Sequence, residues 1–171
     1  LYGCRPARFA GQVWSQLLWA VESSVSQGIA LTGLIADLQK AFNHIPRLVV
    51  FEAAAILGLP MTLLTAWAGA LMKVGRRFQI GPNLTHTLYS STGLPEGDGL
   101  SCLGMLIIDI LFHAWHVHFF PLCQPVSYVD DWTIITTSPA MLNGIQQCLT
   151  RFTDALDMLL DADKTFAWSV T

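Results

Sequence analysis

The stretch that decides the fold is Pro125-Val126-Ser127-Tyr128-Val129-Asp130-Asp131-Trp132-Thr133-Ile134-Ile135-Thr136. Apolar and β-branched residues on both sides of an adjacent pair of acids predict two strands, at residues 125–129 and 132–136, joined by a tip that carries Asp130 and Asp131. Carboxylates at the edge of an apolar core are costly when they are desolvated without a partner. We therefore expect a compensating positive charge close to this tip.

A third acid ends another apolar run, earlier in the chain. Residues 29–38 are typical of a buried strand, in which Asp37 follows Leu34-Ile35-Ala36. Few Lys or Arg residues lie near either acidic site in the sequence, so a divalent metal ion is a candidate for the compensating charge. Oxygen ligands alone favour Mg²⁺ or Mn²⁺ over Zn²⁺. Taken without the rest of the chain, a polar turn at 130–131 and a helix cap at Asp37 explain these acids equally well.

The remaining sequence alternates helices with short strands. Helices are expected over residues 10–26, 46–57, 60–74, 101–118 and 139–160. A hairpin is expected in which residues 78–80 pair with 87–90 around Gly81-Pro82-Asn83, and a last strand is expected near 166–168. Ser101 is a good N-cap, with Leu100 and Met105 spaced for a hydrophobic staple. Strands separated by helices, with one Asp-tipped hairpin, predict an α+β fold in which a sheet is layered with helices.

Composition limits the kind of protein. The chain has 171 residues, of which 53% are hydrophobic and 12% charged. That charged fraction is about half of the roughly 25% usual for soluble domains, which excludes intrinsic disorder and a basic nucleic-acid coat and leaves a membrane protein or the core of a larger protein. The uncharged stretch 53–72 is long enough to span a bilayer, but Gly58-Leu59-Pro60 interrupts it. Two buried helices joined by a turn are therefore favoured.

The net charge of −3 conceals two oppositely charged halves. Residues 1–77 carry seven Lys and Arg against three acids (net +4), and residues 78–171 carry two against nine (net −7). A basic half suits a polyanion and an acidic half suits metal ions, so the two together favour a protein that handles both.

The spacing of the cysteines and histidines matches no standard metal-binding motif. The four cysteines lack a C-x-x-C spacing. The cluster of His113, His116, His118 and Cys123 fits no standard zinc pattern, so structural roles are favoured. On the same helix, Asp109 is spaced to pair with His113 one turn further on.

Four segments share the order and spacing of one family's motifs. They are residues 34–43, where Phe42 follows Asp37 by five positions; residues 93–101, Gly-Leu-Pro-Glu-Gly-Asp-Gly-Leu-Ser; Tyr128-Val129-Asp130-Asp131; and Asp163-Lys164-Thr165. Together they resemble the palm motifs of reverse transcriptases. The opening Gly3-Cys4-Arg5-Pro6-Ala7-Arg8-Phe9, the Gly58-Leu59-Pro60 break and the Arg76-Arg77 hairpin resemble the non-LTR retrotransposon and group II intron branch of that family.

The resemblance implies RNA-directed DNA synthesis by a fingers-palm fragment spanning residues 1–171, with a partial fingers region and no thumb. Asp37 and Asp130 would hold two Mg²⁺ or Mn²⁺ ions, Asp131 would support them, and Lys164 would act near the triphosphate. Since the chain begins without Met, we expect a fragment of a longer protein, a retroelement polyprotein whose remaining domains would be partners.

The resemblance also implies a nucleotide site and a nucleic-acid interface. Phe42 would stack under the incoming sugar and exclude a 2′-hydroxyl, and Gly97 would let the backbone approach closely. Glu96 stands where the family usually has Gln, and Leu38 and Tyr128 would complete the site. The expected contacts with the nucleic-acid backbone are Arg5, Arg8, Arg76 and Arg77.

The expected partners are an RNA template, a DNA primer and dNTPs, and no membrane is expected. The resemblance implies that the protein acts in the nucleus or cytoplasm. Two alternatives stay open. One is an RNA-directed RNA polymerase, which differs in its use of rNTPs. The other is a non-catalytic palm relic that only binds nucleic acid or a partner, which calorimetric Mg²⁺ titration with and without dNTP would distinguish from an enzyme.

Overall fold

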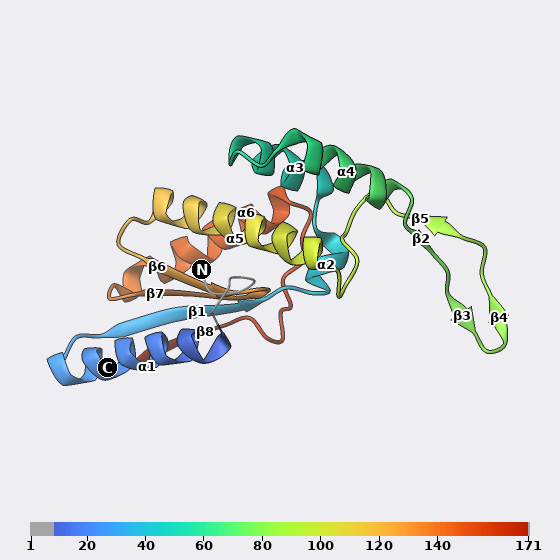
Figure 1. Ribbon diagram of the computed structural model, residues 1–171. Helices are drawn as coiled ribbons and strands as arrows, with labels where there is room; N and C mark the ends of the chain where they lie inside the picture. Colours follow the sequence, from blue (N-terminus) through green and yellow to red (C-terminus); the bar gives the residue numbers. More distant parts are fainter. Residues whose placement is uncertain (1–8, 171) are drawn as a thin grey trace.

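The computed structural model describes residues 9–170. At its centre lies an antiparallel sheet in the order β6-β7-β1-β8, formed by β1 (Leu31–Asp37), β6 (Gln124–Tyr128), β7 (Asp131–Thr136) and β8 (Phe166–Val170). One face is covered by α5 (Gly99–Phe119) and α6 (Leu142–Ala155), and the other by α1 (Ala10–Gln27), as Figure 1 shows. The predicted α+β fold is confirmed.

Alternation along the strands separates the hydrophobic core from the acids. Leu34 and Ala36 on β1, and Trp132 and Ile134 on β7, belong to the core beneath α5 and α6. Successive side chains of a strand point to opposite faces. Asp37 and Asp131 therefore project from the face opposite this core.

Three short helices form a layer beside the sheet: α2 (Ala41–His44), α3 (Arg47–Ile56) and α4 (Met61–Met72). Gly58, with φ 89°, lies in the turn that divides the uncharged stretch 53–72 into α3 and α4, as expected. Phe51 and Trp67 pack edge to face across the two helices, with ring centroids 5.0 Å apart. The helix α2 is an element that the sequence pattern did not predict.

Among residues 9–170, one helix, α5, is long and apolar enough by length and composition to cross a membrane. In this fold α5 lies against the sheet and α6, and its buried residues include the polar Asp109 and His116. This is the placement of a core helix.

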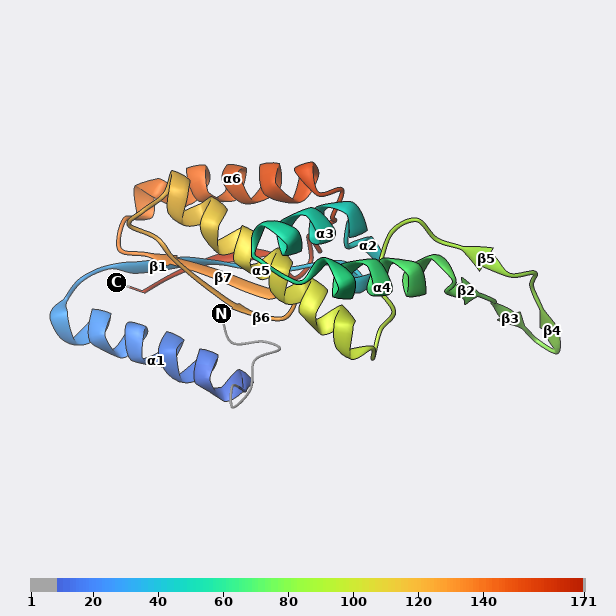
Figure 2. The ribbon, with the colours of Figure 1, turned by 45° about the horizontal axis from the view of Figure 1, so that its top comes forward.

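Residues 75–89 form a narrow ribbon that projects away from the sheet in both Figure 1 and Figure 2. In it, β2 (Gly75–Arg76) pairs with β5 (Leu88–Tyr89), and β3 (Gln79–Ile80) pairs with β4 (Asn83–Leu84). The predicted pairing of 78–80 with 87–90 was wrong. A two-residue loop, Gly81-Pro82, brings β3 against its immediate neighbour, so residues 88–89 meet 75–76 instead.

Two predicted helix ends were also wrong. Helix α5 begins at Gly99 with Asp98 at the N-cap position, so Ser101 and Leu100 lie inside its first turn and no staple with Met105 forms there. Pro139–Met141 form a 3₁₀ turn (η1), and α6 ends at Ala155 rather than near residue 160. Asp157 adopts φ 53°, and the chain then returns to β1, where Gln39 N donates to Leu159 O at 2.8 Å.

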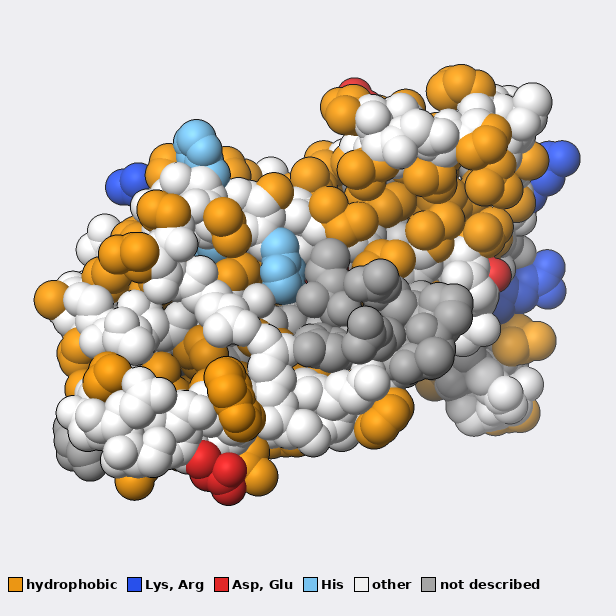
Figure 3. All heavy atoms as spheres, turned by 60° about the vertical axis from the view of Figure 1, so that its left-hand side comes forward, with side chains coloured by type: hydrophobic (Ala, Val, Ile, Leu, Met, Phe, Trp, Pro, Cys, Tyr) orange, Lys and Arg blue, Asp and Glu red, His pale blue; other side chains and the backbone are white. Residues whose placement is uncertain are grey.

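The surface is unusually apolar. Figure 3 shows hydrophobic side chains gathered over much of one face, with few charged ones between them. Large apolar residues more than half exposed occur on α1, α3 and α4: Trp14, Trp19, Leu48, Ile56 and Met61. Exposure of this kind fits the interpretation of the chain as part of a larger core.

Candidate active site

Two of the expected acids are placed together by strand register. Asp37, the last residue of β1, lies directly opposite Asp131, the first residue of β7. Asp131 is in turn opposite Tyr128 at the end of β6, which leaves Val129 and Asp130 as the turn of the β6–β7 hairpin. The predicted tip at 130–131 was therefore wrong by one residue, because Asp131 pairs in β7 and Val129 leaves β6. Opposed residues of an antiparallel pair have Cα atoms about 4.5–5.5 Å apart. The sheet therefore brings Asp37 and Asp131 side by side, with Asp130 in the adjoining turn.

The acids repel one another. Partial burial, together with the negative charges of Asp130 and Asp37, raises the pKa of Asp131 above its ordinary value. Like charges directly opposite on neighbouring strands destabilise a sheet. The site thus carries an excess of negative charge that a cation would neutralise.

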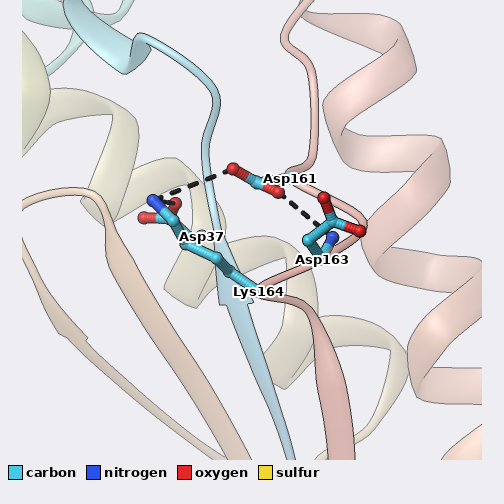
Figure 4. Close-up of polar contacts among 4 residues, drawn as sticks. All are labelled: Asp37, Asp161, Asp163 and Lys164. Atoms are coloured by element: carbon cyan, nitrogen blue, oxygen red, sulfur yellow. Dashed lines mark hydrogen bonds and ion pairs between the residues drawn. The ribbon is translucent and has the colours of Figure 1, made fainter.

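Lys164 supplies one such cation. Its Nζ lies 2.7 Å from Asp37 Oδ2 and 3.7 Å from Asp161 Oδ2 (Figure 4). The hydrogen bond to Asp37 raises the pKa of Lys164. The turn that carries Lys164 is held to β1 because Asp161 N donates to Asp37 O at 2.9 Å. The Lys164 side chain is 66% exposed, so it reaches Asp37 from the solvent side.

The donors at this site suit a divalent ion. Asp37, Asp130 and Asp131 provide carboxylate oxygens only, the ligands that Mg²⁺ and Mn²⁺ prefer. Within residues 9–170, no three His, Cys, Asp or Glu side chains are already clustered as a metal site. One oxygen of Asp37 is engaged by Lys164. The donor chemistry therefore fits, provided that Lys164 moves before both oxygens of Asp37 serve as ligands.

The loop after β5 is hydrogen-bonded to the α2 segment. Leu94 N donates to Phe42 O at 2.6 Å, and Gly93 N donates to Ile45 O at 2.9 Å. Gly93 has φ 75°, and a Cβ there would lie 2.4 Å from Asn43 O. Only glycine fits this contact without displacing the backbone. The loop that carries Glu96 and Gly97 is therefore held in a fixed position beside Phe42.

Arg47 also holds this loop, a role that sequence analysis missed. Its Nε donates to Gly93 O at 2.6 Å and its Nη1 to Ser90 O at 2.7 Å. Burial and the neighbouring Arg76 lower the pKa of Arg47. Spacing gives no signal for this role, because the partners are main-chain oxygens 46 and 43 residues away.

Asn43 links two of the predicted residues. Its Nδ2 donates to Glu96 Oε1 at 3.2 Å, and its Oδ1 accepts from Arg76 Nη1 at 3.3 Å. Arg76 and Glu96 thus meet through Asn43, which the sequence analysis had not singled out. Arg77 lies elsewhere: its Nε donates to Thr87 Oγ1 at 2.8 Å within the ribbon.

The other predicted nucleotide-site residues vary in exposure. Phe42 is half-buried and packs against the core, and Gly97 has φ 82° with open space where a Cβ would lie. Leu38 as a whole residue is only 3% exposed and belongs to the core, so in this structure it offers no open surface to a nucleotide. Tyr128 is partly exposed beside the acids. The remaining predictions, Arg5 and Arg8, fall outside the described residues.

Asp109 and His113 do not pair as predicted, and each contacts a different residue. Asp109 Oδ1 accepts a hydrogen bond from Trp132 Nε1 at 2.8 Å, and His113 Nε2 lies 3.1 Å from Ser127 Oγ. Both partners lie on the β6–β7 hairpin, because α5 packs against the sheet and turns these polar groups toward it.

Comparison with known proteins gives a family and a fold. A family model described as reverse transcriptase (RNA-dependent DNA polymerase) matches residues 6–170. A search of curated proteins finds no match. Apo telomerase from Candida tropicalis truncated from its C-terminal domain is similar in structure, with TM-score 0.73 and 12% identity over 95% of this chain and 35% of that one.

Two further telomerase structures are similar. Telomerase from Candida albicans in complex with a TWJ fragment of telomeric RNA has TM-score 0.69 and 13% identity over 94% of this chain and 31% of that one. Telomerase from C. tropicalis in complex with such a fragment has TM-score 0.73 and 10% identity over 99% of this chain and 30% of that one.

The chain thus spans about a third of the length of these telomerase chains, and at such identities the likeness shows the fold alone. The family match covers nearly the whole chain, including all four motif segments. The chain belongs to the reverse transcriptase (RNA-dependent DNA polymerase) family.

Proposed function

We propose that the protein catalyses RNA-directed DNA synthesis, a template-directed nucleotidyl transfer assisted by two divalent ions. The observation that carries this proposal is the register that sets Asp37 opposite Asp131, with Asp130 in the adjoining turn. A sheet edge where the charges of Asp37 and Asp130 act against that of Asp131 is an arrangement suited to Mg²⁺ or Mn²⁺.

In this proposal Asp37, Asp130 and Asp131 hold the ions. Bound divalent ions lower the pKa of an attacking hydroxyl and stabilise charge on a leaving pyrophosphate. Lys164 moves from Asp37 toward the triphosphate, a shift that its exposed side chain permits. There its ammonium group balances phosphate charge and can donate a proton to the leaving group.

The segment around Phe42 receives the nucleotide. The Phe42 ring, half-buried and supported by the core, presents bulk where a 2′-hydroxyl would lie. The main chain of Gly97 is open to a close approach. Asn43 holds Arg76 and Glu96 beside this position, so Arg76 offers a positive charge to the phosphates that partly offsets Glu96.

The template and primer are expected along the basic half of the chain. No acid lies between Glu52 and Glu96, while Lys73, Arg76 and Arg77 fall in that interval at the base of the exposed ribbon. This charge distribution suits phosphate contacts. The match to the reverse transcriptase (RNA-dependent DNA polymerase) family supports an RNA template, and the motif resemblance favours a retroelement of the non-LTR or group II intron branch with further polyprotein domains.

Primer extension on an RNA template tests the proposal. The 171-residue chain and any longer natural form are assayed with Mg²⁺, and dNTPs are compared with rNTPs. We expect dNTP-dependent extension that Asp130→Asn abolishes and Asp154→Asn, an exposed carboxylate change on α6, leaves intact. Preferred use of rNTPs would support the RNA polymerase alternative. Extension that persists in Asp130→Asn contradicts the assignment of the acids.

Calorimetry separates an enzyme from a palm that only binds nucleic acid. Mg²⁺ is titrated into the protein with and without a dNTP. Catalytic palms bind the metal more tightly when the triphosphate supplies additional oxygen ligands. Binding of RNA without any response to Mg²⁺ or dNTP would favour the non-catalytic alternative.

A further inference from the structure

Asp109 is a buried carboxylate behind the acidic hairpin. It lies on α5, is 1% exposed, and has no ion-pair partner among residues 9–170. Its Oδ1 accepts from Trp132 Nε1 at 2.8 Å. One turn further along the same helix, His113 Nε2 lies 3.1 Å from Ser127 Oγ. Burial of a carboxylate costs folding free energy unless hydrogen bonds compensate for the lost water, and an apolar residue in its place could not make those hydrogen bonds.

The partner of Asp109 and the partner of His113 are register partners in the sheet. Ser127 on β6 pairs directly with Trp132 on β7. Helix α5 therefore contacts both strands of the same hairpin, β7 through Asp109 and β6 through His113, one pair back from Tyr128 and Asp131. Trp132 also pairs with Ala36, the residue before Asp37. Asp109 thus contacts the hairpin directly behind the opposed acids.

The indole of Trp132 connects Asp109 to the start of β7. It is 1% exposed, and it stacks on Phe112 of α5 with ring centroids 4.3 Å apart and planes 15° apart. Phe152 of α6 meets it edge to face at 5.7 Å. Packing of this kind leaves the ring little freedom, so the hydrogen bond from Nε1 ties the start of β7 firmly to Asp109 on α5.

The turn beyond these strands is strained. Val129 has φ 58°, a conformation that a β-branched residue rarely adopts. Strained conformations persist only where the surroundings hold them. Within the part of the chain that the structure describes, the register pair nearest to this turn on the core face is Ser127–Trp132, whose Trp132 donates to Asp109.

We propose that Asp109 is a positioning residue that holds the start of β7 through Trp132 and so sets Asp131 opposite Asp37, with Asp130 in the adjoining turn. The inference concerns the geometry of the hairpin, and its consequence for catalysis rests on the proposed function. Ser127 is fully buried, so its contact with His113 Nε2 at 3.1 Å serves the same hold and is not a nucleophile–base pair open to substrate.

Hydrogen exchange followed by NMR tests the hold on the hairpin. Asp109→Asn keeps an acceptor oxygen, Asp109→Leu removes it, and Trp132→Phe keeps ring stacking but removes the N–H donor. We expect amides of β6 and β7 to exchange at least ~10-fold faster in Asp109→Leu and Trp132→Phe, a tenfold change corresponding to about 1.4 kcal/mol. Asp109→Asn and the exposed control Asp154→Asn should match the parent chain.

Amides of α1, on the far face of the sheet, report whether a change is local. Faster exchange confined to the hairpin supports the proposal. Parent-like exchange of β6 and β7 in Trp132→Phe overturns it, even if Asp109→Leu fails to fold. Equal acceleration in α1 and in the hairpin also overturns it, because Asp109 would then contribute only to global stability.

Mn²⁺ binding followed by electron paramagnetic resonance gives the functional consequence. We expect Asp109→Leu and Trp132→Phe to weaken Mn²⁺ binding several-fold and Asp109→Asn to restore it. If the parent chain and Asp131→Asn bind Mn²⁺ equally, the proposed metal chemistry fails. The exchange measurement still decides the role of Asp109 in that case, so the two failures are distinguishable.

Discussion

Asp37 and Asp131 lie directly opposite each other on β1 and β7, on the face of the sheet that turns away from the core. Partial burial and the charges of Asp130 and Asp37 raise the pKa of Asp131, so the ionised pair works against folding. Sites that hold unfavourable charge in this way are typical of functional regions.

Asp131→Asn should therefore stabilise the fold. Removal of one of two directly opposed charges is expected to raise the free energy of unfolding by about 0.2–1 kcal/mol. Urea unfolding at pH 7 measures the change, with Asp154→Asn as the matched control. A loss of stability in Asp131→Asn, relative to that control, would show that Asp131 makes favourable contacts instead.

Lys164→Gln should strengthen metal binding while slowing nucleotidyl transfer. Nζ of Lys164 lies 2.7 Å from Asp37 Oδ2 and competes with a divalent ion for that oxygen. Its removal frees Asp37 but also removes the cation proposed to act at the triphosphate. Mn²⁺ titration and primer extension measure the two effects. Weaker Mn²⁺ binding in Lys164→Gln would argue against competition at Asp37.

Phe42→Ala should reduce discrimination against ribonucleotides. The half-buried ring of Phe42 supplies bulk, and alanine leaves space for a 2′-hydroxyl. Partial loss of core contact should also cost about 1–3 kcal/mol of stability. Incorporation of rNTPs relative to dNTPs is compared with that of Phe42→Tyr, which keeps the bulk. Unchanged sugar selectivity in Phe42→Ala would refute the steric role.

Two glycines of the same loop should respond differently to alanine. Both have positive φ, 75° at Gly93 and 82° at Gly97, but a Cβ at Gly93 would lie 2.4 Å from Asn43 O while one at Gly97 meets open space. Gly97→Ala should cost about 1–2 kcal/mol from backbone strain alone. Gly93→Ala should cost roughly 2–5 kcal/mol, because overpacking adds to strain. Equal losses in urea unfolding would show that the Gly93–Asn43 contact relaxes easily.

The pH dependence of stability should reveal Asp109 and His113 acting in opposite directions. Burial raises the pKa of Asp109 to about 7, so the folded state binds more protons than the unfolded state between pH 4 and 7, and stability falls as pH rises through that range. Burial lowers the pKa of His113 to about 4, so its contribution rises between pH 4 and 6.5.

Burial also lowers the pKa of His116, which adds to the rise from His113, so the variants are compared with the parent curve. Between pH 4 and 6.5, stability should rise more steeply with pH in Asp109→Asn than in the parent chain, and less steeply, or fall, in His113→Gln. Urea unfolding across this range measures both. Parallel pH curves for the parent chain and Asp109→Asn would mean that Asp109 titrates near its ordinary value.

Some of the site could be predicted from sequence because its signals are local. The acids at the ends of apolar runs, the turn at Gly58 and the motif that carries Lys164 depend on residues close to one another in the chain. The pairing inside the 75–89 ribbon could not be predicted correctly, because several short strands compete for partners there and loop length decides between them. The contacts of Arg47 are main-chain oxygens, which leave no pattern in a sequence.

The sequence by itself determined the kind of fold, the strand that ends at Asp37, the hairpin that carries Asp130 and Asp131, and the family resemblance, because apolar periodicity and motif spacing are properties of neighbouring residues. Only the tertiary structure decided which groups meet. It set Asp131 rather than Asp130 opposite Asp37, brought Lys164 to Asp37 across 127 residues, and turned Asp109 from His113 toward Trp132. Register and helix packing govern such contacts, and both are settled by the whole core at once.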